Sequence, residues 1–446
     1  MISKLRRWEL PNWAIPTSYA FLATLAGLTL PRFESRLSHL YAGISPSAAL
    51  AIYTSVGTGM LAMTGVVFSL IFVMVQFSAA AYSPRLVLWI ARDRVIWHSL
   101  GVFTATFLYS IAAVAWVDRN HSGEVPFLSG WLVLALLLAS VGMFIALVER
   151  VAALQINRML SFTGDRGRDV IGTMFTPFET PIAVVKPEEF ERVPVTQTLV
   201  HIGRPLAIQG IDHSSLLKLA SDSDGIVEVV SSVGDTVVEG TVLIRVHGAT
   251  TQIEEAVLRK TLAMGRERTF DQDPKYAIRL LVDIAIRALS PAVNDPTTAV
   301  QALDQIEDLL LRLGGSRLQT GAARDAGGTL RLVIAEPTWE DFTVLAFDEI
   351  RYCGATSVQI MRRMRALISD LISLLPKERH PVLRRWQERL DSTIARSFED
   401  AEEKLEASIE DRQGLGVPRK PASDPLTSAT IPSLGLTHTL TGDLER

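Results

Sequence analysis

The chain has 446 residues, of which 48% are hydrophobic and 21% charged, and its formal net charge is -4. A charge so close to neutral argues against a nucleic-acid-binding protein, whose contact surface is strongly basic. The single cysteine, Cys353, excludes an intrachain disulfide and any metal site built from several cysteines.

Long apolar segments are concentrated near the start of the chain. A helix needs about 20 apolar residues to cross a hydrocarbon core of about 30 Å, and lipid leaves a spanning segment few alternatives to a helix. Four segments meet this requirement: residues 13–30, 47–81, 95–117 and 126–148. We therefore predict a four-helix transmembrane domain over residues 1–150. Residues 47–81 are longer than one crossing needs, so they form either one projecting helix or two pieces.

Basic residues predict the orientation of these spans, because lysine and arginine are enriched in cytoplasmic flanks. With both termini inside, eight basic residues lie on the inner side and three outside. The inner residues are Lys4, Arg6, Arg7, Arg85, Arg92, Arg94, Arg150 and Arg158, and the outer ones are Arg32, Arg36 and Arg119. We expect both termini, and the large region after the spans, to be cytoplasmic.

The second span combines small and weakly polar residues at helical spacing. Small residues let helices approach closely in lipid, and a polar residue in a span usually meets a partner helix or a wet cavity. Three interpretations stay open: packing within one subunit, contact between subunits, or the lining of a pore. The candidate residues are Thr58, Gly59, Thr64, Gly65, Ser69 and Gln76.

After the spans the chain changes character twice. Residues 151–174 keep helical spacing and predict a connector, whereas residues 175–250 are rich in proline and β-branched residues, which predicts short strands. Two turns, Gly234-Asp235 and Glu239-Gly240, lie in a stretch that resembles one edge of a biotinyl- or lipoyl-type β-sandwich. Those carrier domains need a lysine on a hairpin, and Lys218 falls in a predicted helix instead. We expect a small barrel or sandwich without a cofactor.

Residues 251–410 predict a helical α+β domain with long helices, and residues 411–446, rich in Gly, Pro, Ser and Thr, predict a disordered tail. Asp273-Pro274 and Asp295-Pro296 each have a capping residue followed by proline, which is typical of a helix start. A dense polar cluster surrounds them. It is either a set of caps and surface ion pairs or a ligand or subunit-contact site. Its members are Arg268, Asp271, Asp273, Arg279, Asp283, Arg287, Asn294 and Asp295.

The same region carries a family resemblance. Residues 268–273, 277–285 and 287–299 resemble the central signature of the domain-of-unknown-function 2254 family of predicted bacterial integral membrane proteins. The likeness extends over about residues 10–405. It implies a multi-pass protein of the bacterial inner membrane and brings no activity or catalytic residue with it.

No sequence motif for nucleotide binding, metalloprotease chemistry or serine hydrolysis is present, so we expect no enzyme, no metal and no cofactor. The preferred hypothesis is an oligomeric channel or transport component with a cytoplasmic regulatory domain. The alternative is a membrane-anchored binding or scaffold protein without a pore, and an enzyme of unknown chemistry stays open as a third hypothesis. The expected partners are the lipid bilayer, further copies of the chain and a cytoplasmic protein, without nucleic acid.

Overall fold

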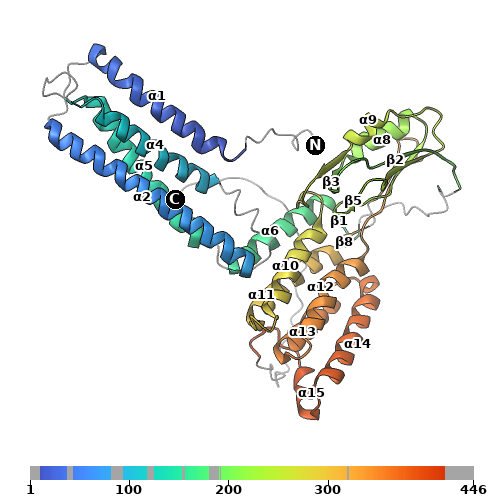
Figure 1. Cartoon of the computed structure of the whole chain (residues 1–446). Coiled ribbons are helices and arrows are strands. Elements are labelled where there is room, and N and C mark those ends of the chain that lie inside the picture. The colour runs from blue at the N-terminus through green and yellow to red at the C-terminus, as the bar shows by residue number, and fades with distance from the viewer. Residues whose placement is uncertain are drawn as a thin grey trace.

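The computed structural model describes residues 11–37, 44–81, 94–117, 125–152, 156–179, 190, 192–318 and 321–416. Four long helices lie in one bundle, and the strands and remaining helices lie beyond one end of it (Figure 1). The four helices are α1 (Ala14–Leu37), α2 (Pro46–Ala81), α4 (Arg94–Val114) and α5 (Phe127–Ala152). Each is long and apolar enough to cross a membrane, as the sequence predicts.

The second span is one continuous helix. α2 has 36 residues, which corresponds to about 54 Å of helix. That length exceeds a hydrocarbon core of about 30 Å, so part of α2 projects beyond the core even when the helix is tilted. α2 also contacts α10 (Pro274–Ala288) of the extramembrane region.

The extramembrane region begins with α6 (Ile156–Met174), which packs on the long helices α10 and α11. Its other helices are α8 (His213–Asp222), α9 (Glu255–Lys260), α10 (Pro274–Ala288), α11 (Pro296–Gly314), α12 (Trp339–Cys353), α13 (Val358–Leu374), the 3₁₀ helix η2 (Lys377–Arg379), α14 (His380–Ser397) and α15 (Ala401–Ala407). α10 and α11 begin at the predicted prolines, and the predicted caps are confirmed. The side chain of Asp273 accepts a hydrogen bond from the Tyr276 amide, and that of Asp295 from the Thr298 amide.

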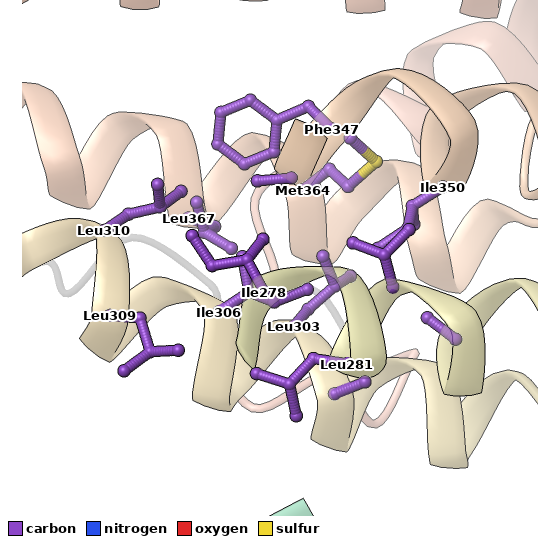
Figure 2. Packing of buried hydrophobic residues seen from close by; sticks show 14 of the residues in the cluster. Ile278, Leu281, Leu303, Ile306, Leu309, Leu310, Phe347, Ile350, Met364 and Leu367 are labelled. Carbon is purple, nitrogen blue, oxygen red and sulfur yellow. The ribbon is translucent and has the colours of Figure 1, made fainter. Parts of the chain in front are cut away.

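The helical part has one apolar core. Figure 2 shows Ile278 and Leu281 of α10 and Leu303 and Ile306 of α11 in this core, beneath side chains of α12 and α13. The apolar face of α14 closes the same core through Leu383, Trp386 and Leu390. Helices with such one-sided apolar faces gain most of their stability from packing.

The strands form open sheets, and no closed barrel is found among the described residues, so the sandwich alternative describes them better. A five-stranded sheet has the order β2-β6-β4-β10-β9 and a three-stranded sheet the order β5-β3-β7, while β1 pairs with β8. Both larger sheets contribute to one apolar cluster. The strands are β1 (Thr176–Pro177), β2 (Val195–Val200), β3 (Leu206–Ile211), β4 (Ile226–Val229), β5 (Thr236–Val237), β6 (Val242–His247), β7 (Leu262–Gly265), β8 (Ser316–Arg317), β9 (Ala322–Arg324) and β10 (Leu330–Ile334).

The C-terminal end of the described chain folds back onto α13. Asp411 is buried and accepts hydrogen bonds from the amides of Gln413, Gly414 and Gly416. Arg362 of α13 donates to the carbonyl oxygens of Glu406 and Gly416. Residues 411–416 therefore have a fixed path, and residues 417–446 of the predicted tail lie outside the described residues.

Candidate functional site

The centre of the membrane bundle is α4, which packs against α1, α2 and α5. Its closest neighbour is α1. A Cβ atom added at Gly27 would lie 2.5 Å from the Cβ atom of Ala112, and one added at Gly101 would lie 2.7 Å from the ring of Tyr19. The small residues that bring two helices together are thus in α1 and α4. The sequence signal for them, glycine and alanine four residues apart, was present but weaker than that of the second span.

Polar side chains inside the bundle bond to one another across helices. The hydroxyls of Thr106 in α4 and Ser140 in α5 lie 2.9 Å apart, and the Tyr109 hydroxyl donates to Ser129 Oγ at 3.3 Å. Such hydrogen bonds link helices in lipid at about 0.6 kcal/mol on average. Sequence reasoning did not single out these residues. The large side chains of Phe103 and Tyr109 are also fully buried there.

The candidate residues of the second span occupy a different face. Tyr53, Gly57 and Val67 of α2 are buried against the bundle. Thr64 is half-buried, and its hydroxyl donates to the Met60 carbonyl at 2.8 Å. The other candidates are exposed on the outward side: Thr58, Gly59, Gly65, Ser69 and Gln76.

This outward side is open. Among the residues that the structure describes, a Cβ atom added at Gly59 or Gly65 would meet no neighbouring side chain or helix within 4 Å. Gly59 and Gly65 therefore make no close contact among the described helices of one subunit, and the role of the six candidate residues stays a prediction. In a membrane the face contacts lipid or another protein chain.

The polar cluster of the extramembrane region divides into separate groups. In the first, Arg268 forms an ion pair with Asp273, with 2.6 Å between Nη2 and Oδ2. Asp273 is 2% exposed. Burial raises the pKa of its carboxyl, and the charge of Arg268 opposes that rise. The pair lies against Gly234, so it joins a turn of the β part to the start of α10.

In the second group, Arg279 of α10 bridges two carboxylates. Its Nε donates to Asp283 at 2.7 Å, and its Nη2 lies 2.6 Å from Glu349 of α12. This ties α10 to α12 near the surface. Arg287, two turns further along α10, is half-buried.

The third group is the turn between α10 and α11. Asn294 has a φ of +50°, which asparagine tolerates better than most residues. Asp295 accepts from the Thr298 hydroxyl at 2.6 Å as well as from its amide. Asp271 is exposed beside the first group. The contacts of the three groups are caps and ion pairs at different places along α10, and a ligand or subunit-contact role stays a prediction.

A buried charge cluster that the sequence did not reveal joins α11 to α13. Arg363 has a side chain only 5% exposed, and it pairs with Glu307 and with Asp304 at 2.8 Å. Burial raises the pKa of the Glu307 carboxyl, against the opposing charge of Arg363. Removing one partner of such a pair leaves a buried charge, so this cluster fixes how α13 sits on α11.

Within the part of the chain that the structure describes, no group of three or more His, Cys, Asp or Glu side chains could hold a metal ion. The expectations of no metal and no cofactor stay predictions.

Four spans and an α+β extramembrane region define a multi-pass membrane protein. The model of a family described as "Predicted membrane protein (DUF2254)" matches residues 11–370, and the chain belongs to that family. The resemblance seen in the signature residues is thereby confirmed.

Two mycobacterial relatives show the same kinship at a distance. The chain is 25% identical over 373 residues to "Uncharacterized protein Rv1290c" of Mycobacterium tuberculosis (strain H37Rv). This alignment covers 81% of the chain and 71% of the relative. "Uncharacterized protein Mb1321c" of Mycobacterium bovis matches with the same identity and coverage. No solved structure matches the chain.

Proposed function

We propose that the protein is one subunit of an oligomeric channel or transport component, without catalytic activity of its own. The observation that carries the proposal is the outward face of α2, defined by Thr58, Gly59, Gly65, Ser69 and Gln76. Small residues on a lipid-facing surface let a second helix pack closely against α2, whereas they have no comparable stabilising contact with lipid.

The large buried side chains of the bundle support a path between subunits. Phe103 and Tyr109 are buried in the middle of the four helices, which argues against a path through a single subunit. A ring of subunits with α2 facing inward would instead place Thr58, Ser69 and Gln76 along a shared axis. Hydroxyl and amide groups are suitable linings for a water-filled pore.

The extramembrane region is suited to regulate such a pore. α2 projects beyond the hydrocarbon core and contacts α10, whose first turn is tied to the β part by Arg268 and Asp273. A movement of the extramembrane region would therefore be transmitted to α2. We place this region in the bacterial cytoplasm, as the distribution of basic residues predicts.

Native mass spectrometry of the full chain in lipid nanodiscs tests the proposal. We expect a closed oligomer of three or more subunits, and we expect Gly59→Leu combined with Gly65→Leu to shift it toward monomers. Gly142→Leu is the matched control, since a Cβ atom at Gly142 of α5 also meets nothing within 4 Å. A monomer at every protein concentration would refute the proposal.

Ion flux provides the second test. Liposomes containing the wild-type protein should release potassium or chloride, and Thr58→Val or Gln76→Leu should change the rate without changing the subunit number. An oligomer that carries no flux under any of these conditions would leave α2 as an assembly surface and count against a pore.

One exposed loop favours the alternative of a membrane-anchored binding protein. Pro291, Ala292 and Asn294 are exposed in the signature segment between α10 and α11, and Val293 is 51% exposed. The stability of the helices does not require an apolar side chain at this exposed position. A photo-crosslinking residue at position 293 that captures one soluble protein, together with a monomeric wild type, would support this alternative.

A further inference from the structure

A basic groove runs between α12 and α14 on the surface of the helical part. It encloses about 570 Å³ and is lined mainly by Arg351, Arg385, Arg389 and Arg396, with Asp348 and Glu388. Four arginines against two carboxylates leave the groove positively charged. None of these residues belongs to the candidate face of α2 or to the polar cluster around α10.

Helical spacing aligns the arginines of α14. Arg385, Arg389 and Arg396 are four and seven residues apart, which brings them to one face over about 16 Å of helix. Arg351 faces them from the last turn of α12. The groove is therefore a row of guanidinium groups along one wall with a further one opposite.

Two of the four guanidinium groups already have carboxylate partners. Arg351 lies 2.9 Å from Asp348, and Arg385 lies 3.1 Å from Glu340. Arg351 also donates to the Thr393 hydroxyl at 2.7 Å, while its buried Nε has no hydrogen-bond partner.

The other two guanidinium groups are not neutralised. Arg389 lies over the ring of Trp386 at 4.7 Å, and Arg396 Nε donates to the Ser392 carbonyl at 3.0 Å. Neither has a carboxylate within 4.0 Å among the described residues. Arginine at such a position is well suited to bind phosphate oxygens with two parallel hydrogen bonds.

The lining narrows the class of ligand. Arg389 and Arg396 are about 10 Å apart along the helix, so an anion that contacts both in their separate positions needs more than one phosphoryl group. The groove lining has no aromatic or aliphatic side chain against which a nucleobase could stack. Glu388 also lines the groove and would repel an anion, so it reduces the affinity that the arginines provide.

The position of the groove favours a soluble ligand over a lipid headgroup. α14 packs on α12, α13 and α15, whereas α10 of the same helical part contacts α2. Figure 1 shows α14 on the side of the helical part that faces away from the transmembrane bundle. We propose that the groove between α12 and α14 binds a small soluble polyphosphate anion through Arg389 and Arg396.

Isothermal titration of inorganic triphosphate into the full chain, held in phosphatidylcholine nanodiscs, tests the proposal. We expect binding that weakens as salt is raised, and we expect the double variant R389Q/R396Q to weaken it at least tenfold. R384Q is the matched control, because Arg384 is exposed on α14 but does not line the groove, and it should change binding less than twofold. Circular dichroism and thermal melting should show both variants folded.

Three outcomes would overturn the proposal: no binding of triphosphate by the wild type, equal binding by R389Q/R396Q, or an equal loss in R384Q. A second titration in nanodiscs that contain phosphatidic acid separates the two sources of phosphate. We expect the same affinity for triphosphate there. Competition by phosphatidic acid that depends on Arg389 and Arg396 would assign the groove to a lipid headgroup and refute the soluble ligand.

Discussion

Arg268 and Asp273 form an ion pair at the junction between the β part and the helical part of the extramembrane region. Nη2 and Nε of Arg268 lie 2.6 and 2.9 Å from the same carboxylate oxygen of Asp273. The other carboxylate oxygen accepts from the Tyr276 amide at 3.1 Å and caps α10. Asp273 thus caps α10 and also binds Arg268, which lies in the segment that leads into this helix from the β part.

Removing this carboxylate should lower stability by two routes. We expect Asp273→Ala to reduce the free energy of unfolding by about 2–4 kcal/mol, because it removes the helix cap and leaves Arg268 without its partner. Asp273→Asn keeps a cap acceptor and should cost roughly half as much. Thermal melting of the extramembrane region in the full chain measures both. A melting temperature of Asp273→Ala equal to that of the wild type would contradict this role.

A pair of glycine variants tests the contact of this ion pair with the β part. Gly234 and Gly240 have φ values of +90° and +85°, so alanine is strained at either position. A Cβ atom at Gly234 would also collide with Arg268 and Asp273, whereas one at Gly240 meets nothing within 4 Å. Gly240→Ala should cost about 1–2 kcal/mol in the free energy of unfolding, and Gly234→Ala clearly more. If the two variants lost the same amount of melting temperature, Arg268 and Asp273 would have moved aside for the methyl group at position 234.

Local signals in the sequence predicted much of this architecture. The spans follow from uninterrupted apolar runs, the starts of α10 and α11 from Asp-Pro pairs, and the turns at Gly234 and Gly240 from a repeated glycine pattern. Each of these features depends on residues a few positions apart. That is the range over which propensity and capping act.

Features that depend on distant residues were not predictable in the same way. β10 pairs in parallel with β4 although about a hundred residues and the helices α10 and α11 separate them, and Leu332 lies opposite Val227. Their partnership is set by a shared apolar core, which no local pattern reveals. The polar cluster is dense along the chain but divides in space, because α10 turns its charged residues toward different neighbours.

The contact between α1 and α4 predicts a selective effect of glycine substitutions in the membrane. Gly27→Val should destabilise the bundle by about 1–3 kcal/mol, because its side chain would overlap Ala112 of α4. Gly142→Val on α5 should be nearly neutral, since a Cβ atom there meets nothing within 4 Å. The temperature at which each variant loses its monodisperse peak in detergent chromatography measures the difference. If Gly142→Val lowered this temperature as much as Gly27→Val does, close packing of α1 on α4 would not explain the effect of the Gly27 substitution.

The single cysteine offers a direct test of orientation. Cys353 lies at the end of α12 and is exposed. If the extramembrane region is cytoplasmic, a membrane-impermeant maleimide should leave Cys353 unlabelled in intact cells and label it in inverted membrane vesicles. The variant Cys353→Ser gives the background in both preparations, and labelling in intact cells would reverse the predicted topology.

The pH of this labelling experiment follows from the surroundings of the thiol. Although the Cys353 side chain is exposed, neighbouring atoms partly desolvate its thiol, and this desolvation together with the charge of Glu349 raises the pKa above its ordinary value. Because the thiolate is the reacting form, less of it is present at neutral pH than for a free cysteine. The labelling rate in inverted vesicles should therefore keep rising above about pH 9.5, where the rate of a free cysteine with a pKa of about 8.5 has levelled off. A rate that levels off together with that of free cysteine would show that α12 leaves this thiol open to water and away from Glu349.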